Sequence, residues 1–203
     1  MEYAIIRPEF LARRNNRNNL RELVRDVLVC FGATDPHRLT LKVLCALEEG
    51  LAHEMKLHVV VGPGFTFKEE VREAVRRAPA ELKLYEDVQD MARLMDSCDI
   101  GIVGGGTTLM EMCCLGCPSV TIAQNQAEMR FARYLSDRGA ARNIGMAGQV
   151  SEEIIRAALF ELGIDWTARK KLARQGQALI DGHGRNRTAA LILREFKAKR
   201  QSA

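Results

Sequence analysis

The sequence has few aromatic residues and little net charge. Of its 203 residues only 5% are aromatic, and 30 basic residues nearly balance 26 acidic ones, which leaves a formal charge of +4. A nucleic-acid-binding protein normally gathers its basic residues on one face. Here they are spread along the chain, apart from arginine-rich stretches within 7–25 and 72–77 and a basic tail at 197–200. We therefore expect no nucleic-acid partner.

Long hydrophobic runs are also missing. No stretch approaches the ~18 consecutive apolar residues that cross a membrane, and the chain does not open with a signal-peptide pattern. We expect a cytoplasmic protein without a membrane span. The 47% hydrophobic content, mostly Val, Ile and Leu, is ample for the core of one large domain, with or without an appended arm.

The cysteines lack the pattern that a zinc site needs. All six stand within strand or helix patterns, at Cys30, Cys45, Cys98, Cys113, Cys114 and Cys117. This placement favours reduced, buried thiols. Cys114 and Cys117 lie at the end of a predicted helix, where the helix dipole raises a thiol pKa. Because no second pair and no nearby histidine completes a ligand set, we expect no metal and no cofactor.

What the sequence does contain is a regular alternation of strand and helix patterns. Six short apolar runs are predicted strands, at 27–32, 57–62, 82–85, 99–103, 119–123 and 141–144. Helical spacing marks 36–52, 67–77, 88–97, 107–115 and 127–138, and then 151–162, 167–180 and 185–199. Strands that alternate with such helices predict an α/β fold. We expect a Rossmann-like parallel sheet of about six strands with helices on both faces.

The most informative segment is Asp99–Pro118, DIGIVGGGTTLMEMCCLGCP. Three glycines follow a predicted strand, where they let the backbone turn and let a ligand approach closely. A helix then begins, and its N-terminus offers N–H donors to a phosphate. The candidate diphosphate-binding residues are Gly104, Gly105, Gly106, Thr107 and Thr108. Glu111 is placed to accept hydrogen bonds from ribose hydroxyls; the alternative is a capping box in which Glu111 bonds back to Thr108.

Other unusual residues fall at the same predicted sheet edge. In an open parallel sheet, ligands bind beyond the carboxyl ends of the strands. The first strand is followed by Gly32 and Asp35, the second by Gly62-Pro63-Gly64, and the fifth by the carboxamides Gln124, Asn125 and Gln126. Carboxamides can pair with sugar hydroxyls as donors and as acceptors. Together these loops predict a site for a phosphorylated, polyhydroxylated ligand.

Six motifs follow one another along the chain: FGATDP (31–36), VVVGPGF (59–65), VQDMARLM (88–95), GGGTTLMEMCCLGCP (104–118), AQNQ (123–126) and DGHGRNR (181–187). In this order they resemble the C-terminal nucleotide-binding domain of GT-B proteins, as in the family-28 glycosyltransferases. They are also similar to the UDP-sugar hydrolases of pseudaminic acid biosynthesis (UDP-2,4-diacetamido-2,4,6-trideoxy-β-L-altropyranose hydrolases) and to related spore-coat polysaccharide proteins. The opening YAIIRPEF (3–10) is similar to the linker between the family's two domains.

The resemblance implies a role for each motif. The loop and helix start at 104–108 would hold the diphosphate, and Gly32 would let the first loop close on it. Glu111 would take the ribose hydroxyls, and the backbone around Val88 would face the uracil. The sugar would face Asn125 and Gln126.

This sequence departs from the family pattern in two loops and in its extent. Ala33 and Thr34 stand in place of Gly-Ser, and Gln124 stands where Glu is usual. The family's N-terminal domain, which carries the histidine that acts as catalytic base, has no counterpart here. None of His37, His53, His58 and His183 replaces that base convincingly, and His183 is the one to test. The implied division is a linker or arm at 1–26, a nucleotide-sugar-binding domain at 27–182 and a C-terminal helix at 183–203.

Three functions remain open at this point. The resemblance implies the UDP-sugar-binding domain of a hydrolase that acts on a UDP-linked amino-sugar in surface polysaccharide or nonulosonic acid biosynthesis. The alternatives are a UDP-sugar-dependent glycosyltransferase domain and a non-catalytic nucleotide-sugar-binding module. The chain is then either a fragment of a longer protein or a stand-alone half. The missing N-terminal domain would act in cis or as a partner subunit.

Overall fold

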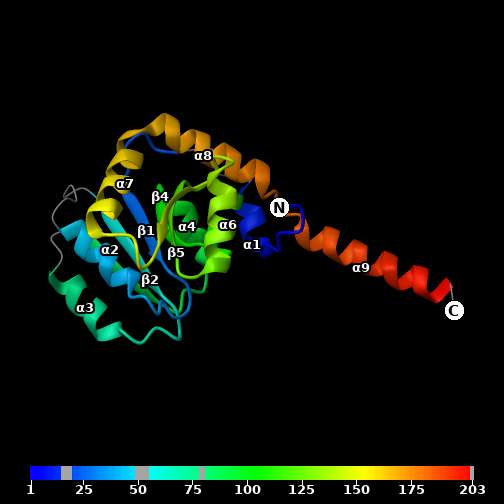
Figure 1. The fold of residues 1–203 in the computed structure, drawn as a ribbon, viewed down its shortest axis with the longest axis horizontal. Coiled ribbons are helices and arrows are strands. Elements are labelled where there is room, and N and C mark those ends of the chain that lie inside the picture. The colour runs from blue at the N-terminus through cyan, green and yellow to red at the C-terminus, as the bar shows by residue number, and fades with distance from the viewer. Residues whose placement is uncertain (15–19, 49–54, 78–80, 202–203) are drawn as a thin grey trace.

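A single parallel sheet forms the centre of the molecule (Figure 1). The computed structural model describes residues 1–14, 20–48, 55–77 and 81–201. Its strands are β1 (Asp26–Cys30), β2 (Lys56–Val61), β3 (Glu81–Glu86), β4 (Ile100–Gly104), β5 (Ser119–Ala123) and β6 (Arg142–Met146). They lie in the order β3-β2-β1-β4-β5-β6, and every neighbouring pair is parallel. This is the doubly wound order, in which the direction of winding reverses between β1 and β4.

Helices cover both faces of the sheet, which confirms the predicted α/β architecture. They are α1 (Pro8–Arg14), α2 (Leu39–Glu48), α3 (Lys68–Arg77), α4 (Met91–Ser97), α5 (Thr107–Leu115), α6 (Gln126–Ser136), α7 (Glu152–Ile164), α8 (Trp166–Leu179) and α9 (Gly184–Gln201). One hydrophobic cluster joins the sheet to α2, α3 and α7, and a second joins it to α1, α4, α5 and α6. Helix α8 packs on α5 and α7.

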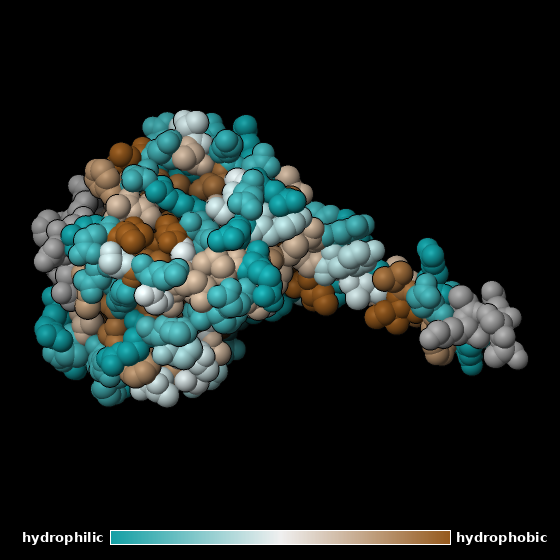
Figure 2. All heavy atoms as spheres, viewed as in Figure 1, coloured by the Kyte–Doolittle hydropathy of each residue, from teal (hydrophilic) through white to brown (hydrophobic). Residues whose placement is uncertain are grey.

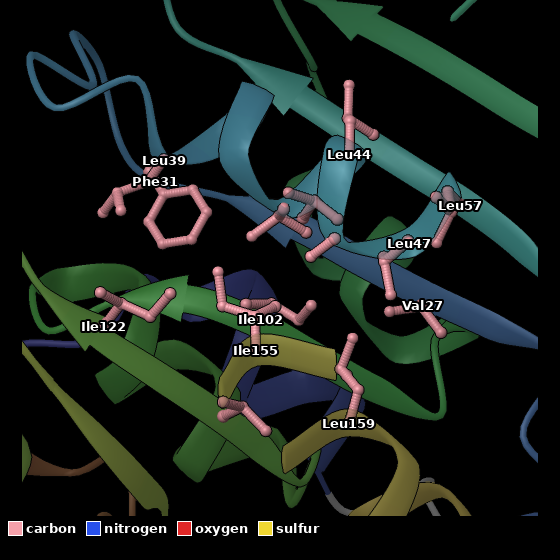
Figure 3. Packing of buried hydrophobic residues seen from close by; sticks show 14 of the residues in the cluster. Val27, Phe31, Leu39, Leu44, Leu47, Leu57, Ile102, Ile122, Ile155 and Leu159 are labelled. Atoms are coloured by element: carbon pink, nitrogen blue, oxygen red, sulfur yellow. The ribbon is translucent and has the colours of Figure 1, made fainter. Parts of the chain in front are cut away.

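The four inner strands β1, β2, β4 and β5 are mostly apolar because both of their faces are buried, whereas the edge strands β3 and β6 are more exposed and more polar. In β1, Val27 and Val29 point into the first cluster, whereas Leu28 and Cys30 point into the second. Figure 3 shows the first cluster, in which side chains of β1, β4 and β5 meet those of α2 and α7. Because side chains on both faces of these inner strands enter apolar clusters, the strands could be recognised in the sequence as short apolar runs.

Element bounds differ from the sequence prediction mainly at helix starts. Strand β5 and helix α5 have the predicted bounds. Helix α2 begins at Leu39 instead of Pro36, because Asp35 and Arg38 adopt positive φ angles of 43° and 55° and form a turn before it. Helix α4 begins at Met91 instead of Val88, because Asp90 caps it by accepting a hydrogen bond from the backbone N–H of Arg93 at 2.8 Å.

The N-terminal segment contains a helix, α1, that the sequence analysis did not predict. Phe10 is fully buried in the second cluster. The guanidinium of Arg14 donates to the carbonyl oxygens of Cys114, at 3.1 Å, and Gln177, at 3.0 Å. These contacts dock α1 against α5 and α8. The interpretation of residues 1–26 as a linker to another domain stays a prediction.

Five of the six cysteines are buried, but the prediction is wrong for Cys45, which is exposed. Helix α2 turns Val43, Leu44 and Leu47 toward the core, which leaves position 45 on its outer face. Burial raises the pKa of the Cys113 thiol to about 12. Among the described residues no group of three or more His, Cys, Asp or Glu side chains could hold a metal ion.

Helix α9 projects away from the rest of the molecule (Figure 1). It carries four large apolar side chains with exposed fractions between 44% and 63%: Leu191, Ile192, Leu193 and Phe196. Figure 2 shows apolar residues along this projection, beyond the globular part. No helix in the described part of the chain is long and apolar enough to cross a membrane.

Candidate functional site

Loops from four strands meet at the carboxyl edge of the sheet, around the point between β1 and β4 where its winding reverses. A Cβ atom on Gly62, after β2, would lie 2.4 Å from the Cα of Ala33, after β1. A Cβ on Gly104, at the end of β4, would lie 3.2 Å from Nε2 of Gln124, after β5. The predicted loops are therefore in contact, and glycine is required where two backbones approach so closely.

The start of α5 is the part of this edge best suited to an anion. Its N-cap is Gly106, and no side chain makes a capping hydrogen bond there. The capping-box alternative, in which Glu111 bonds back to Thr108, is therefore wrong: the N-cap is Gly106, and the Glu111 carboxylate accepts from Arg7 instead. The positive end of the helix dipole thus points at the site, and the N-cap residue itself supplies no side-chain hydrogen bond there.

Glu111 forms an ion pair with Arg7, which stands just before α1. Nε of Arg7 donates to Oε1 of Glu111 at 2.9 Å, and the Glu111 side chain is only 12% exposed. Burial raises the pKa of the Glu111 carboxyl, and the Arg7 guanidinium opposes that rise. Sequence reasoning missed Arg7 because nothing in the local pattern links residues so far apart in the chain.

In the loop after β1, Gly32 is exposed to solvent, whereas Asp35 is buried and hydrogen-bonded. Gly32 is exposed with a φ of +83°, and a Cβ there would meet nothing within 4 Å. Asp35 is buried, and its two carboxylate oxygens accept hydrogen bonds from the backbone N–H groups of Leu39, at 2.9 Å, and Thr40, at 2.7 Å. The Asp35 carboxylate therefore caps α2.

We expect Asp35→Ala to lower the free energy of unfolding by about 1–3 kcal/mol, because two buried N–H donors lose their acceptor. Asp35→Asn is the matched control, since Asn keeps an acceptor oxygen and tolerates a positive φ. Urea denaturation of both variants measures the difference. Equal stability of the two variants would contradict the capping role.

The loop after β5 is held by its own hydrogen bonds. Asn125 is the N-cap of α6, and its Oδ1 accepts from the N–H of Glu128 at 3.0 Å. Nε2 of Gln124 donates to the carbonyl oxygen of Phe31 at 3.0 Å, while Gln126 is exposed at the first position of α6. The structure thus brings these carboxamides to the site's edge and uses two of them to shape the loop.

Glu128 is a site residue that sequence reasoning missed. Its Oε2 accepts from the N–H of Gly105 at 3.1 Å and from the N–H of Gln124 at 2.9 Å. The signal was the spacing Asn125-x-x-Glu128, which is typical of a capping box at a helix start. The Glu128 carboxylate, however, also accepts a hydrogen bond from outside its own helix, from Gly105 in the glycine loop.

The Val88 backbone lies at the same sheet edge, in the loop between β3 and α4. Val88 is half-buried and packs against the second hydrophobic cluster, which also holds α4 and α5. The residue before it, Asp87, has a positive φ of 56°, so the loop turns sharply at this point.

The described histidines do not gather at the glycine loop. His58 sits between Oδ1 of Asp26, at 2.7 Å, and the hydroxyl of Tyr85, at 2.8 Å, and Asp26 begins β1 at the opposite edge of the sheet. His183 follows Gly182, which packs against Cys114 near the end of α5 that is remote from the glycine loop. His37 is exposed before α2, and His53 lies outside the described residues.

Comparison with known proteins agrees with this geometry. Residues 21–162 match the model of the glycosyltransferase family 28 C-terminal domain. The chain belongs to this family. The family 28 domain is also 31% identical over 192 residues to the spore coat polysaccharide biosynthesis protein SpsG of Bacillus subtilis (strain 168). That match covers 94% of this chain and 56% of SpsG, so the chain spans little more than half the length of that relative.

Solved glycosyltransferases share the fold of the domain. Acinetobacter baumannii MurG superposes with a TM-score of 0.71 at 19% identity, over 87% of this chain and 54% of MurG. The spinosyn rhamnosyltransferase SpnG, in its complex with thymidine diphosphate, gives a TM-score of 0.60 at 22% identity, over 82% of this chain and 43% of SpnG. The six-stranded parallel sheet with helices on both faces thus has the fold found in GT-B glycosyltransferases, as the sequence predicted.

Proposed function

We propose that this family 28 domain binds the UDP moiety of a UDP-linked amino-sugar for a hydrolase of surface polysaccharide or nonulosonic acid biosynthesis. The observation that carries the proposal is the start of α5. It lacks a side-chain cap and faces the place where the loops after β1, β4 and β5 meet. Such a helix terminus suits a diphosphate because its N–H groups and dipole both favour negative charge.

The proposed ligand spans the carboxyl edge of the sheet. Its diphosphate lies at 104–108 with Gly32 open beside it, its ribose hydroxyls reach Glu111, and its uracil faces the backbone of Val88. Its sugar faces Asn125 and Gln126. When the anomeric C–O bond breaks, negative charge develops on the departing diphosphate. Backbone dipoles already aimed at that oxygen stabilise the charge without further reorganisation.

The domain as proposed works together with a second domain, in cis or as a partner subunit. The match to SpsG leaves nearly half of that relative outside this chain. Of the described histidines only His37 stands in a loop of this sheet edge, where it is exposed before α2. In this proposal the second domain supplies the catalytic base. The exposed apolar side chains of α9 provide a surface for such a partner.

A glycosyltransferase is the second candidate function. The solved structures that share the fold include glycosyltransferases, one of them complexed with a nucleoside diphosphate. The ligand and the leaving group would be the same, and a sugar or lipid acceptor would replace water. UDP release from a UDP-amino-sugar by the complete protein, measured with and without acceptor, separates the two. A non-catalytic module would release no UDP under either condition.

We expect UDP to bind about tenfold or more tightly than UMP, because the second phosphate contacts the start of α5 and one charge-assisted hydrogen bond is worth about that factor. Calorimetric titration of the domain with both nucleotides measures the ratio. Equal affinity for UMP and UDP would contradict the role of the glycine loop in binding the second phosphate.

CDP and ADP should displace UDP poorly if the Val88 backbone recognises uracil. Displacement of UDP by CDP as effective as by UDP itself would contradict the uracil contact.

A further inference from the structure

We infer that Glu128 is a positioning residue, which clamps the glycine loop so that the N–H groups from Gly106 onward, and not that of Gly105, receive the diphosphate. The inference rests on the proposed nucleotide site and refines it. It starts from the unusual position of a carboxylate at the very loop that is proposed to bind an anion.

The clamp joins the ends of three strands. Oε2 of Glu128 accepts from Gly105, at the end of β4, and from Gln124, after β5, at 3.1 and 2.9 Å. The side chain of Gln124 continues the connection to the carbonyl oxygen of Phe31, after β1, at 3.0 Å. The two loops that flank the reversal point of the sheet are thereby held in one arrangement.

Packing around Gly105 supports the same arrangement. A Cβ on Gly105 would lie 2.8 Å from the carbonyl oxygen of Glu128 and 2.9 Å from its Cβ, so α6 rests directly on this glycine. On Gly106 a Cβ would meet only Oε1 of Glu128, at 3.9 Å. The Gly105 side of the loop is thus filled by α6, whereas a side chain on Gly106 would touch only the end of the Glu128 carboxylate.

The Glu128 carboxylate keeps its hydrogen bond to Gly105 when the ligand binds, and does not give up this position to the diphosphate. Gly105 is buried, so withdrawing the carboxylate would leave a buried N–H without an acceptor, which is unfavourable. The Gly105 N–H thus stays occupied by the carboxylate, and the diphosphate is left with the N–H groups of Gly106, Thr107 and Thr108. The role of Gly105 is then to let α6 pack directly against the loop, which a side chain at this position would prevent.

Two substitutions test the clamp. Glu128→Gln keeps an oxygen that can accept from both N–H groups, whereas Glu128→Ala removes it. In the ligand-free domain, we expect amide hydrogen exchange at Gly105 and Gln124 to speed up by about tenfold or more in Glu128→Ala and to stay close to wild type in Glu128→Gln. Glu195→Ala, which removes an exposed carboxylate on α9, is the matched control.

Nucleotide titration provides the second measurement. We expect Glu128→Ala to weaken UDP binding by about tenfold with little change for UMP, and Glu128→Gln to bind UDP like wild type. Tighter UDP binding by both variants would show that Glu128 competes with the ligand and would overturn the inference. So would an equal loss of UMP and UDP affinity, or unchanged exchange at Gly105. If the wild-type domain binds no UDP, the proposed function fails, and the exchange rates still decide whether the clamp exists.

Discussion

Replacing Arg169 with alanine is expected to lower the free energy of unfolding by about 3–5 kcal/mol, because it removes a buried charge-assisted hydrogen-bond network. Arg169 lies on α8 and is fully buried. Its guanidinium donates to the carbonyl oxygens of Leu162, at 2.8 Å, and Arg21, at 3.1 Å, and also to those of Gly163 and Glu22. One side chain thus ties the end of α7 to the segment that leads into β1.

The matched control is Arg174→Ala, which removes an exposed arginine from the same helix and should change stability by less than about 0.5 kcal/mol. Arg169→Lys should recover little, because a single ammonium cannot reproduce the forked geometry that reaches carbonyls on two sides. Chemical denaturation of the three variants decides the matter. An Arg169→Ala protein as stable as Arg174→Ala would show that these carbonyls find other donors.

Replacing Glu111 with alanine is expected to weaken UDP binding by about ten- to a hundredfold, which corresponds to the loss of about 1.5–3 kcal/mol of charge-assisted hydrogen bonding to the ribose. The melting temperature of the ligand-free domain should change little. Glu111 does not cap its helix, and its partner Arg7 is 50% exposed, so the ion pair contributes about 1 kcal/mol at most. Titration and thermal unfolding of the same variant measure both quantities.

Two controls separate ribose binding from the ion pair. Arg7→Ala breaks the pair and leaves the carboxylate in place, so it should retain most of the UDP affinity. Glu111→Gln preserves size and removes the charge. The preference of the wild type for UDP over 2′-deoxy-UDP should disappear in Glu111→Ala. A variant that melts early and binds UDP normally would mean that the carboxylate is structural.

Local patterns in the sequence were sufficient for the architecture. The mostly apolar runs at 57–61 and 119–123 identify strands because a strand buried on both faces carries few polar residues. Glycines at 104–106 followed by threonines identify a strand-to-helix turn, and α5 begins where that pattern places it. The first residues of helices α2 and α4 were predicted less accurately. Asp35 and Asp90 act through side-chain caps and turns that competed with the helical spacing around them.

The sequence by itself determined the α/β alternation, the parallel sheet and the edge at which the candidate residues gather, because these follow from periodicities within each segment. Only the tertiary structure decided what those residues contact. Arg7 reaches Glu111 across 104 positions of sequence, and Glu128 reaches Gly105 from another helix. Arg169 binds carbonyls of Arg21 and Glu22 nearly 150 residues away. Such pairings depend on how packed elements are placed relative to one another, and no local propensity encodes that placement.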